Sequence, residues 1–259
     1  MQWMTLFQKE LLENWRNKKW IWVPLVIILL SIMDPLTTYY LPYIIEATGG
    51  MPSGVVIEEL PEYAPSEVLL MTLSQLSMLG VLVIVLISMG TISGERKSGV
   101  SELVLVKPVS YMNYITAKWV SYLLLVWVSL FLGILVSWYY INILFGTLSF
   151  GDFVTTFFFY GIWLTFVVSL TIFYNTLFKS SGLVAFFSIL SIMVMSMITK
   201  IFHHILDWSP NNITEYIIDT ISTGEISKDL ILTGIITTAL SLTLILLSSQ
   251  FLKRKEMAG

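Results

Sequence analysis

Six long apolar runs divide this chain of 259 residues and restrict its fold more than any other feature. Each is close to or above the length of about 20 residues that a helix needs to cross the hydrocarbon core of a bilayer. The runs are continuous, whereas the strands of a membrane barrel alternate apolar and polar residues. We therefore expect an all-α integral membrane protein with six transmembrane helices. The runs cover residues 20–41, 68–92, 119–141, 153–177, 181–202 and 230–252.

The composition supports a membrane location. Hydrophobic residues make up 56% of the chain and charged residues 12%, whereas a soluble domain carries about 25% charged residues. A water-soluble globule of this length would lack the polar surface it needs. The chain has no cysteine, which excludes disulfides, thiolate metal sites and thiol catalysis.

The distribution of charge predicts the orientation in the membrane, because Lys and Arg prefer cytoplasmic loops. With the N-terminus inside and six spans, twelve of the 14 basic residues fall inside and only Lys200 and Lys228 outside. We expect both termini in the cytoplasm and extracellular loops at 42–67 and 203–229. Helical spacing of Ile213, Ile217 and Ile221 predicts an amphipathic helix at, or dipping into, the outer interface.

Residues 1–19 are predicted to form an amphipathic elbow helix before the first span. Trp3, Phe7, Leu11 and Trp15 recur every four residues, with charged residues between them. Such a stripe is typical of a helix that lies flat on a membrane surface. The helix is either a plain anchor or an anchor that also contacts a cytoplasmic partner.

The segment 93–118, between the second and third spans, is longer than a turn requires and carries dense positive charge. Within it, residues 98–106 can form a short helix that Pro108 ends. Val100, Leu103 and Val104 would share one side of that helix, which suits docking into a groove of another protein. A plain solvated loop is the alternative.

Motifs for catalysis are missing from the sequence. Gly94 to Ser101 has the glycine spacing of a phosphate-binding loop, but Val100 stands where the loop needs lysine. His203 and His204 have no second cluster of metal ligands beside them. We therefore expect no enzyme, with any ATP used by a different chain.

Asp34, followed by Pro35 late in the first run, is a carboxylate inside a predicted span. Such a charge is costly and often functional. Two interpretations stay open, a structural kink near the outer interface or a part of a transport pathway. The sequence shows no intramembrane basic partner, which argues against an ion-coupled relay.

The segment after the second span also resembles a known family, the ABC-2 type permeases. The pattern reads Ile92-Ser-Gly-Glu95-Arg96-Lys97-Ser-Gly99, then Glu102-Leu103, Lys107-Pro108-Val109-Ser110 and Lys118-Trp119. Val100 and Ala117 stand where the family commonly has Thr and Gly. The resemblance covers the whole chain in layout, as a single permease domain over 1–259, and its specific motif spans about Ile92 to Lys118.

The resemblance implies the membrane subunit of an ATP-binding cassette exporter in the cytoplasmic membrane of a bacterium or archaeon. Two permease subunits, identical or sister chains, would pair with two ATPase subunits that hold ATP and Mg²⁺. This chain would bind no cofactor and no nucleic acid. Residues 98–106 would form the coupling helix in the ATPase groove. The implied coupling residues are Glu95, Arg96, Gly99, Val100, Glu102, Leu103, Val104 and Pro108, and the elbow contacts are Phe7, Glu10, Leu11 and Arg16.

Two other functions remain open from the sequence. One is a sensor or immunity membrane subunit that docks an ATPase without transport, and the other is an ion-coupled secondary transporter. The substrate is also open. Glu58, Glu59 and Glu62 in the acidic outer loop would attract cationic peptides.

Overall fold

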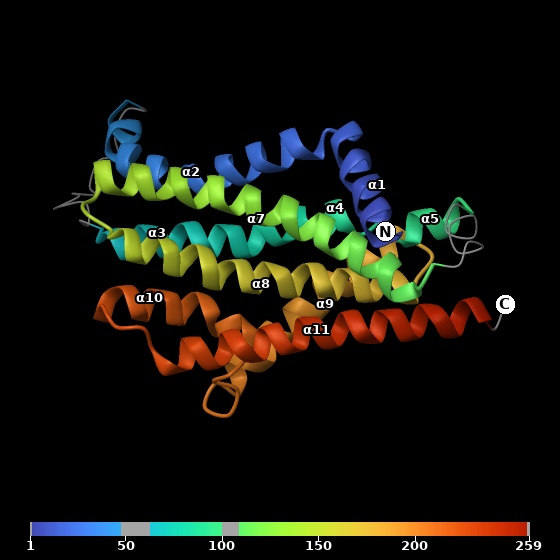
Figure 1. Cartoon of the computed structure of the whole chain (residues 1–259). Coiled ribbons are helices and arrows are strands. Elements are labelled where there is room, and N and C mark those ends of the chain that lie inside the picture. Colours follow the sequence, from blue (N-terminus) through green and yellow to red (C-terminus); the bar gives the residue numbers. More distant parts are fainter. Residues whose placement is uncertain (1, 48–62, 100–108, 258–259) are drawn as a thin grey trace.

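The computed structural model describes residues 2–47, 63–99 and 109–257, and all regular structure in those ranges is helical (Figure 1). The order of elements is α1 (Gln2–Arg16), α2 (Lys19–Ala47), α3 (Pro65–Gln75), the π-helical turn η1 (Leu76–Gly80), α4 (Val81–Ser88), α5 (Ser93–Lys97), α7 (Tyr111–Leu144), α8 (Phe150–Leu177), α9 (Ser181–Ile201), the 3-10 turn η2 (Pro210–Asn212), α10 (Ile213–Thr223) and α11 (Lys228–Met257).

The six predicted spans are confirmed, by length and composition. They are carried by α2, by the stack α3–η1–α4–α5, and by α7, α8, α9 and α11. Several are longer than the apolar runs. The helix α7 covers 34 residues, because it continues through Lys118 at one end and Asn142 at the other, where an apolar run is interrupted.

The spans surround α8, whose apolar window is 67% buried, whereas that of α9 is 17% buried. Along the bundle, α2 packs beside α7 and α11 beside α8 (Figure 1). A Cβ at Gly133 of α7 would lie 2.8 Å from the side chain of Ile27 in α2. That approach needs glycine, and it lets α2 and α7 lie close together.

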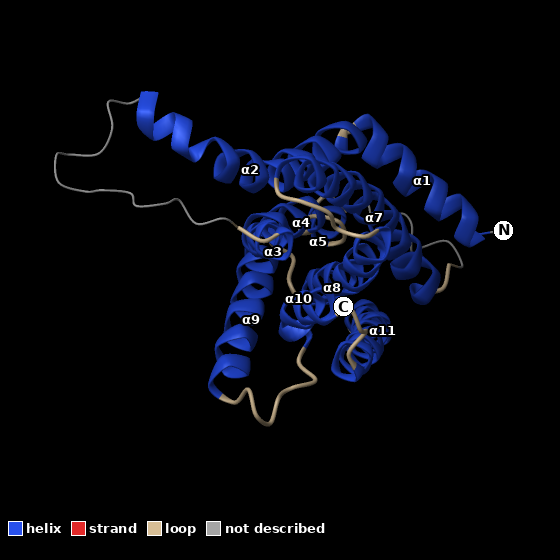
Figure 2. Ribbon diagram, turned by 90° about the vertical axis from the view of Figure 1, so that its left-hand side faces the viewer, coloured by secondary structure: helices blue, strands red, loops and turns tan. Residues whose placement is uncertain are grey.

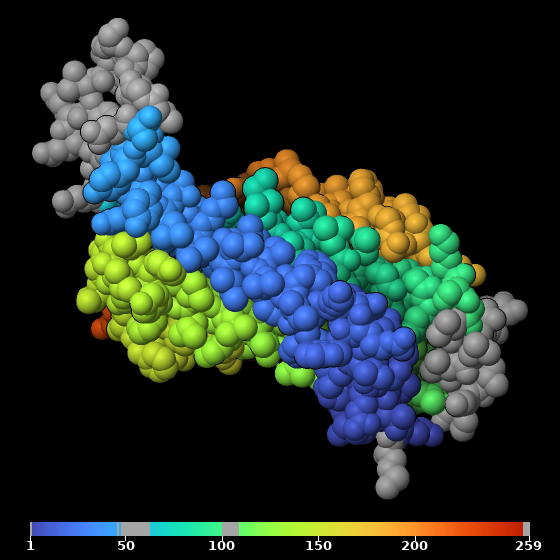
Figure 3. All heavy atoms as spheres, turned by 90° about the horizontal axis from the view of Figure 1, so that it is seen from above, coloured from blue at the N-terminus to red at the C-terminus, as the bar shows by residue number. Residues whose placement is uncertain are grey.

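The two ends of the bundle differ. The N-terminus, α5 and the C-terminus lie at one end (Figure 1), which we call the terminal end. The α7–α8 connection and α10 lie toward the other end. Seen from above in Figure 3, α2 crosses the bundle beside α3 and α4, with α9 beyond them.

Side-chain hydrogen bonds cap the starts of two spans. Ser149 and Asp152 form a reciprocal capping box at the start of α8, and the Ser227 hydroxyl accepts from the amide of Leu230 at 3.0 Å. These caps satisfy amides that have no partner within the helix. Only residues 178–180 separate α8 from α9, as expected for a tight hairpin.

The predicted amphipathic helix in the second outer loop is α10. Ile213 and Ile217 are buried, and α10 packs against α3 and α8. It therefore belongs to the packed bundle. In the first predicted loop, α2 continues to Ala47 and α3 begins at Pro65, while residues 48–62, with Glu58, Glu59 and Glu62, lie outside the described ranges.

Candidate functional site

Three helices meet at the terminal end, where α1 crosses the start of α7 next to α5. Polar contacts fix the crossing. The Trp3 indole donates to the Thr116 hydroxyl at 3.0 Å, and the Asn14 amide donates to the Ser121 hydroxyl at 3.1 Å. Between them, Lys118 donates to Glu10 at 2.8 Å. The face of α1 that packs on the bundle is thus polar.

Four charged side chains meet at this crossing, and we call Lys9, Glu10, Glu95 and Lys118 the charge cluster. Lys118 lies 2.8 Å from Glu10 and 2.9 Å from Glu95. Lys9 lies 3.0 Å from Glu10 and also pairs with Glu95. The Tyr114 hydroxyl donates to the second oxygen of Glu95. One residue of α5 is therefore joined to α1 and α7 at once.

The charge cluster balances two carboxylates with two ammonium groups. The Lys118 side chain is only 1% exposed, and that of Glu95 is 11% exposed. Burial alone would lower the pKa of Lys9, but the carboxylates of Glu10 and Glu95 outweigh it and raise that pKa above its ordinary value. Removing the buried Lys118 ammonium would leave the two carboxylates poorly compensated, and breaking a buried pair in this way typically costs about 3–5 kcal/mol.

The carboxylates of Glu10, Glu13 and Glu95 lie within 4.8 Å of one another, a grouping that also occurs in metal sites. Here Lys9 reaches all three, including Glu13 at 3.3 Å. An ammonium group thus occupies the position that a cation would take. The cluster fits internal charge pairing better than metal binding.

Asn175 of α8 holds the break between α4 and α5. Its side-chain oxygen accepts from the amides of Ile92 and Ser93 at 3.2 and 3.1 Å. Its amide nitrogen donates to the carbonyls of Ser88 and Thr171 at 3.0 and 2.9 Å. Asn175 is completely buried, so these four bonds fix where the second span ends and α5 begins.

Two cations close the C-terminal end of α8. Arg96 of α5 donates to the carbonyl of Thr176 at 3.1 Å, and Lys255 of α11 donates to the carbonyl of Leu177 at 2.5 Å. Carbonyls at a helix C-terminus lack intrahelical partners and favour positive charge. Together with Asn175, these bonds attach α5 to α8.

Glu95 and Arg96, both predicted coupling residues, hold α5 to the bundle. The left-handed backbone of Gly99 (φ +77°) follows α5, a conformation that glycine adopts without strain. The predicted coupling residues Val100, Glu102, Leu103, Val104 and Pro108, and most of the predicted helix 98–106, lie outside the described residues.

The predicted elbow is the helix α1. Three of its four predicted contact residues, Phe7, Glu10 and Leu11, have the spacing of one helix face, and Arg16 lies on another side. Glu10 is buried in the charge cluster. Phe7 stacks on Trp3 with ring centroids 5.2 Å apart, Leu11 is half-buried and Arg16 is exposed. Trp15 of the predicted apolar stripe is exposed, because the polar residues Glu10 and Asn14 fill the face against α7.

Sequence reasoning missed three residues of this site. Lys118 was treated as one more inside charge, and Asn14 and Asn175 were not considered. A polar side chain within an apolar run is the available signal, and Asn175 carries it clearly in α8. Each of the three has a partner 82 to 108 residues away, and spacing along the chain could not identify those contacts.

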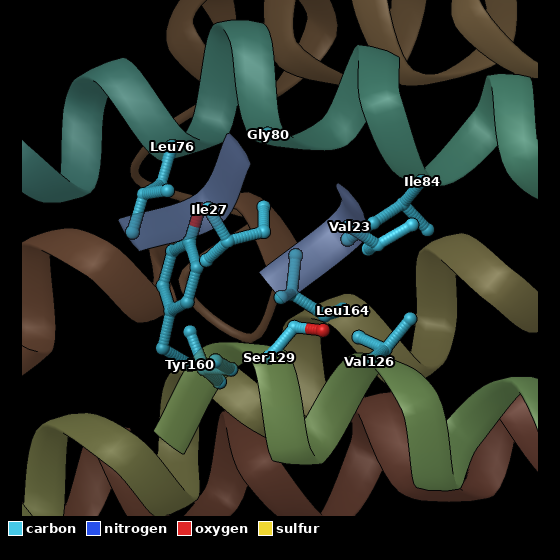
Figure 4. A pocket seen from close by; sticks show the side chains of 10 residues that line it. Val23, Ile27, Leu76, Gly80, Ile84, Val126, Ser129, Tyr160 and Leu164 are labelled. Atoms are coloured by element: carbon cyan, nitrogen blue, oxygen red, sulfur yellow. The ribbon is translucent and has the colours of Figure 1, made fainter. Parts of the chain in front are cut away.

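Inside the bundle, apolar side chains and Ser129 surround a small cavity between α2, η1, α7 and α8 (Figure 4). Its volume is about 10 Å³, close to what one water molecule occupies by this measure. Tyr160 lines it from α8 (Figure 4). This cavity is too small for an organic substrate.

Fold and site together define a multi-pass helical membrane protein with a polar assembly at one end, where the second span turns away from the bundle. The family model of the ABC-2 family transporter proteins matches residues 4–255. The chain belongs to this family. An uncharacterized transmembrane protein of Bacillus subtilis (strain 168), YxlG, is 33% identical over 211 residues, which cover 81% of each chain. The predicted family is confirmed.

Proposed function

We propose that this chain is the permease subunit of an exporter whose ATP hydrolysis takes place in a separate cytoplasmic ATPase. Family membership supports a transporter membrane subunit. The observation that carries the finer proposal is the charge cluster, because it joins α5 to α1 and α7 directly before the predicted coupling segment. A push on that segment would reach three helices through Glu95.

The terminal end is assigned to the cytoplasm by the distribution of Lys and Arg. The predicted coupling helix, residues 98–106, follows α5 at that end and would enter a groove of the ATPase. Closure of two ATPase subunits around ATP would then favour one of two arrangements of the bundle, as the differential binding of two states requires.

The pathway is assigned to the contact between two permease subunits. The cavity of about 10 Å³ inside one bundle does not accommodate a substrate. The span α9 leaves most of its apolar window unburied within one chain. A second permease, identical or a sister chain, would supply the other wall of the path in the cytoplasmic membrane.

The test is affinity purification of the tagged chain from native membranes, followed by identification of the proteins that accompany it. Wild type is compared with Leu103→Asp in the predicted coupling helix. The matched control is Ile226→Asp, which places the same charge on an exposed isoleucine at the opposite end. We expect an ATPase with its own phosphate-binding loop beside wild type and the control, and its loss with Leu103→Asp.

Absence of any ATPase beside wild type after gentle extraction would contradict the proposal. An ATPase that still accompanies Leu103→Asp would mean that the ATPase does not bind through the predicted coupling helix. Transport itself is tested by comparing cells that lack or overproduce the permease and ATPase. A compound released to the medium only when both are present supports export. Unchanged media would favour an ATPase-docking subunit without transport.

A further inference from the structure

Asp34 lies in the second half of the first span, which runs from Lys19 to Ile45. The helix α2 runs from Lys19 to Ala47, so Asp34 is about 22 Å from Lys19 along the helix axis. The exposed Tyr39, Tyr40 and Tyr43 follow it, and tyrosines are typical of the membrane–water interface. Asp34 is one or more turns deeper than this aromatic level.

The carboxylate of Asp34 has a single polar partner among the described residues. The amide of Gln75 in α3, with its NH₂ turned toward α2, donates to both oxygens of Asp34, to Oδ1 at 3.1 Å. An ionised carboxylate accepts about four hydrogen bonds. Over residues 2–47, 63–99 and 109–257, no cationic side chain pairs with it.

An unusual backbone follows Gln75 directly. The π-helical turn η1 begins at the next residue and covers Leu76–Gly80. Its Ser77 bonds to the buried hydroxyl of Tyr160 at 3.1 Å. Such turns inside helices often accompany functional sites.

The pair lies on a surface that the chain does not cover. Asp34 and Gln75 are partly exposed. Met33, which precedes Asp34, and Met78, three residues after Gln75, are exposed apolar residues, Met78 by 76%. In the view along the bundle, α2 and α9 flank α3 on this side (Figure 2). The side-chain carboxyl of Asp34 thus lies at a largely apolar surface within the first span.

We propose that Asp34, oriented by Gln75, binds the positively charged group of a lipophilic cation at this surface. A carboxylate at this depth is costly without compensation. Its one polar partner among the described residues is an amide, so a bound cation would favour the ionised form and occupy acceptor positions that the amide leaves open. The apolar side chains around it suit the apolar body of such a molecule. The substrate class of the proposed exporter is thereby narrowed to amphiphilic cations.

The charge excludes other occupants of the same surface. A lipophilic anion would be repelled by Asp34. An identical second subunit that placed its own Asp34 opposite would add a second negative charge in a medium of low dielectric constant. A cation satisfies both the charge and the open hydrogen-bond positions.

The experiment measures equilibrium binding of radiolabelled tetraphenylphosphonium to the full-length protein in nanodiscs of zwitterionic lipid. Tetraphenylborate, an anion of nearly the same shape, serves as competitor. We expect saturable binding to wild type that excess tetraphenylborate does not displace. Asp34→Asn should weaken it about tenfold or more, whereas Asp34→Glu, which keeps the charge, should retain most of it.

The matched control is Asp219→Asn, which removes an exposed carboxylate in α10. Its binding should equal that of wild type. Each variant is first shown to be monodisperse and helical. Wild type without saturable binding, Asp34→Asn with unchanged affinity, or displacement by tetraphenylborate as strong as by unlabelled cation would each overturn the inference.

The cation site would be a substrate site only if the chain is an exporter, so its role in the cell rests on the proposed function. The two fail separately, because binding is measured without an ATPase. Loss of the cation site alone leaves the exporter proposal intact with another substrate. Loss of the ATPase partner alone leaves a cation-binding membrane protein.

Discussion

This protein places carboxylates away from water at two sites, the charge cluster and the surface around Asp34. The two sites differ in how the carboxylates are compensated. In the charge cluster, Glu10 and Glu95 meet Lys9 and Lys118 at 2.8 to 3.0 Å or closer. Within the first span, Asp34 has the amide of Gln75 as its one polar partner among the described residues. Charges that hold helices together are compensated inside the chain. A charge left without compensation at membrane depth is available to something outside it.

The largest expected change in stability comes from removing a buried member of the charge cluster. Lys118→Met should lower the stability of the purified protein by about 3 kcal/mol or more, because Glu10 and Glu95 would lose their buried partner and keep only the partly exposed Lys9. Thermal unfolding in detergent, followed by fluorescence-detected size exclusion, measures this. The exposed Lys97→Met is the control and should change stability by less than about 0.5 kcal/mol. Equal effects of the two variants would contradict the structural role of the cluster.

The next effect concerns the attachment of α5. Asn175→Leu should cost about 2 kcal/mol, because the buried amides of Ile92 and Ser93 lose their acceptor. The loss should be local. Hydrogen exchange followed by mass spectrometry should show faster exchange in residues 89–97, while peptides of α8 stay protected. Uniform loss of protection would mean that Asn175 stabilises α8 more than the turn into α5.

Removing the carboxylate of Asp34 should change stability in the opposite direction. Asp34→Asn keeps the shape of the side chain and removes a charge that the chain does not neutralise, so stability should stay equal or rise by about 1 kcal/mol. The same thermal assay measures it beside Lys118→Met. A clear loss of stability with Asp34→Asn would show that Asp34 holds helices together. Asp34 would then have the same structural role as the charge cluster.

The smallest effect separates the two lysines of the charge cluster. The Lys9 side chain is 39% exposed and that of Lys118 is 1% exposed, so solvent screens Lys9 more. Lys9→Met should cost about 1 kcal/mol, and its effect should shrink in 1 M salt. Thermal midpoints at low and high salt test this. A loss of stability as large as that of Lys118→Met would mean that Lys9, in α1, contributes as much to the cluster as the buried Lys118.

The spans could be predicted from the sequence because crossing a bilayer imposes one simple length requirement on each of them. The ends of the spans were less predictable. The apolar run of the third span starts at Trp119, yet α7 starts at Tyr111. The reason is that Lys118 is neutralised by partners from α1 and α5, so the helix passes through a position that looks like a membrane boundary.

The elbow shows a second limit of sequence reasoning. A helix was expected and α1 is one, but the apolar stripe was a poor guide to its packing. Trp15 is exposed, whereas Glu10 and Asn14 are buried against α7. At a membrane surface the apolar side of a helix such as α1 can face lipid. Its polar side is then the side that packs against the rest of the protein. The coupling roles of residues 100–108 stay predictions.

The polar inner face of α1 has a consequence for biosynthesis. Glu10 and Lys118 are 108 residues apart, so α1 is made well before the helix on which it docks. At typical elongation rates of 5–20 residues per second, about 5–20 s separate the two. During that interval the carboxylate of Glu10 and the amide of Asn14 stay hydrated at the membrane surface. A face of leucines would instead expose the nascent chain to premature association with other hydrophobic segments.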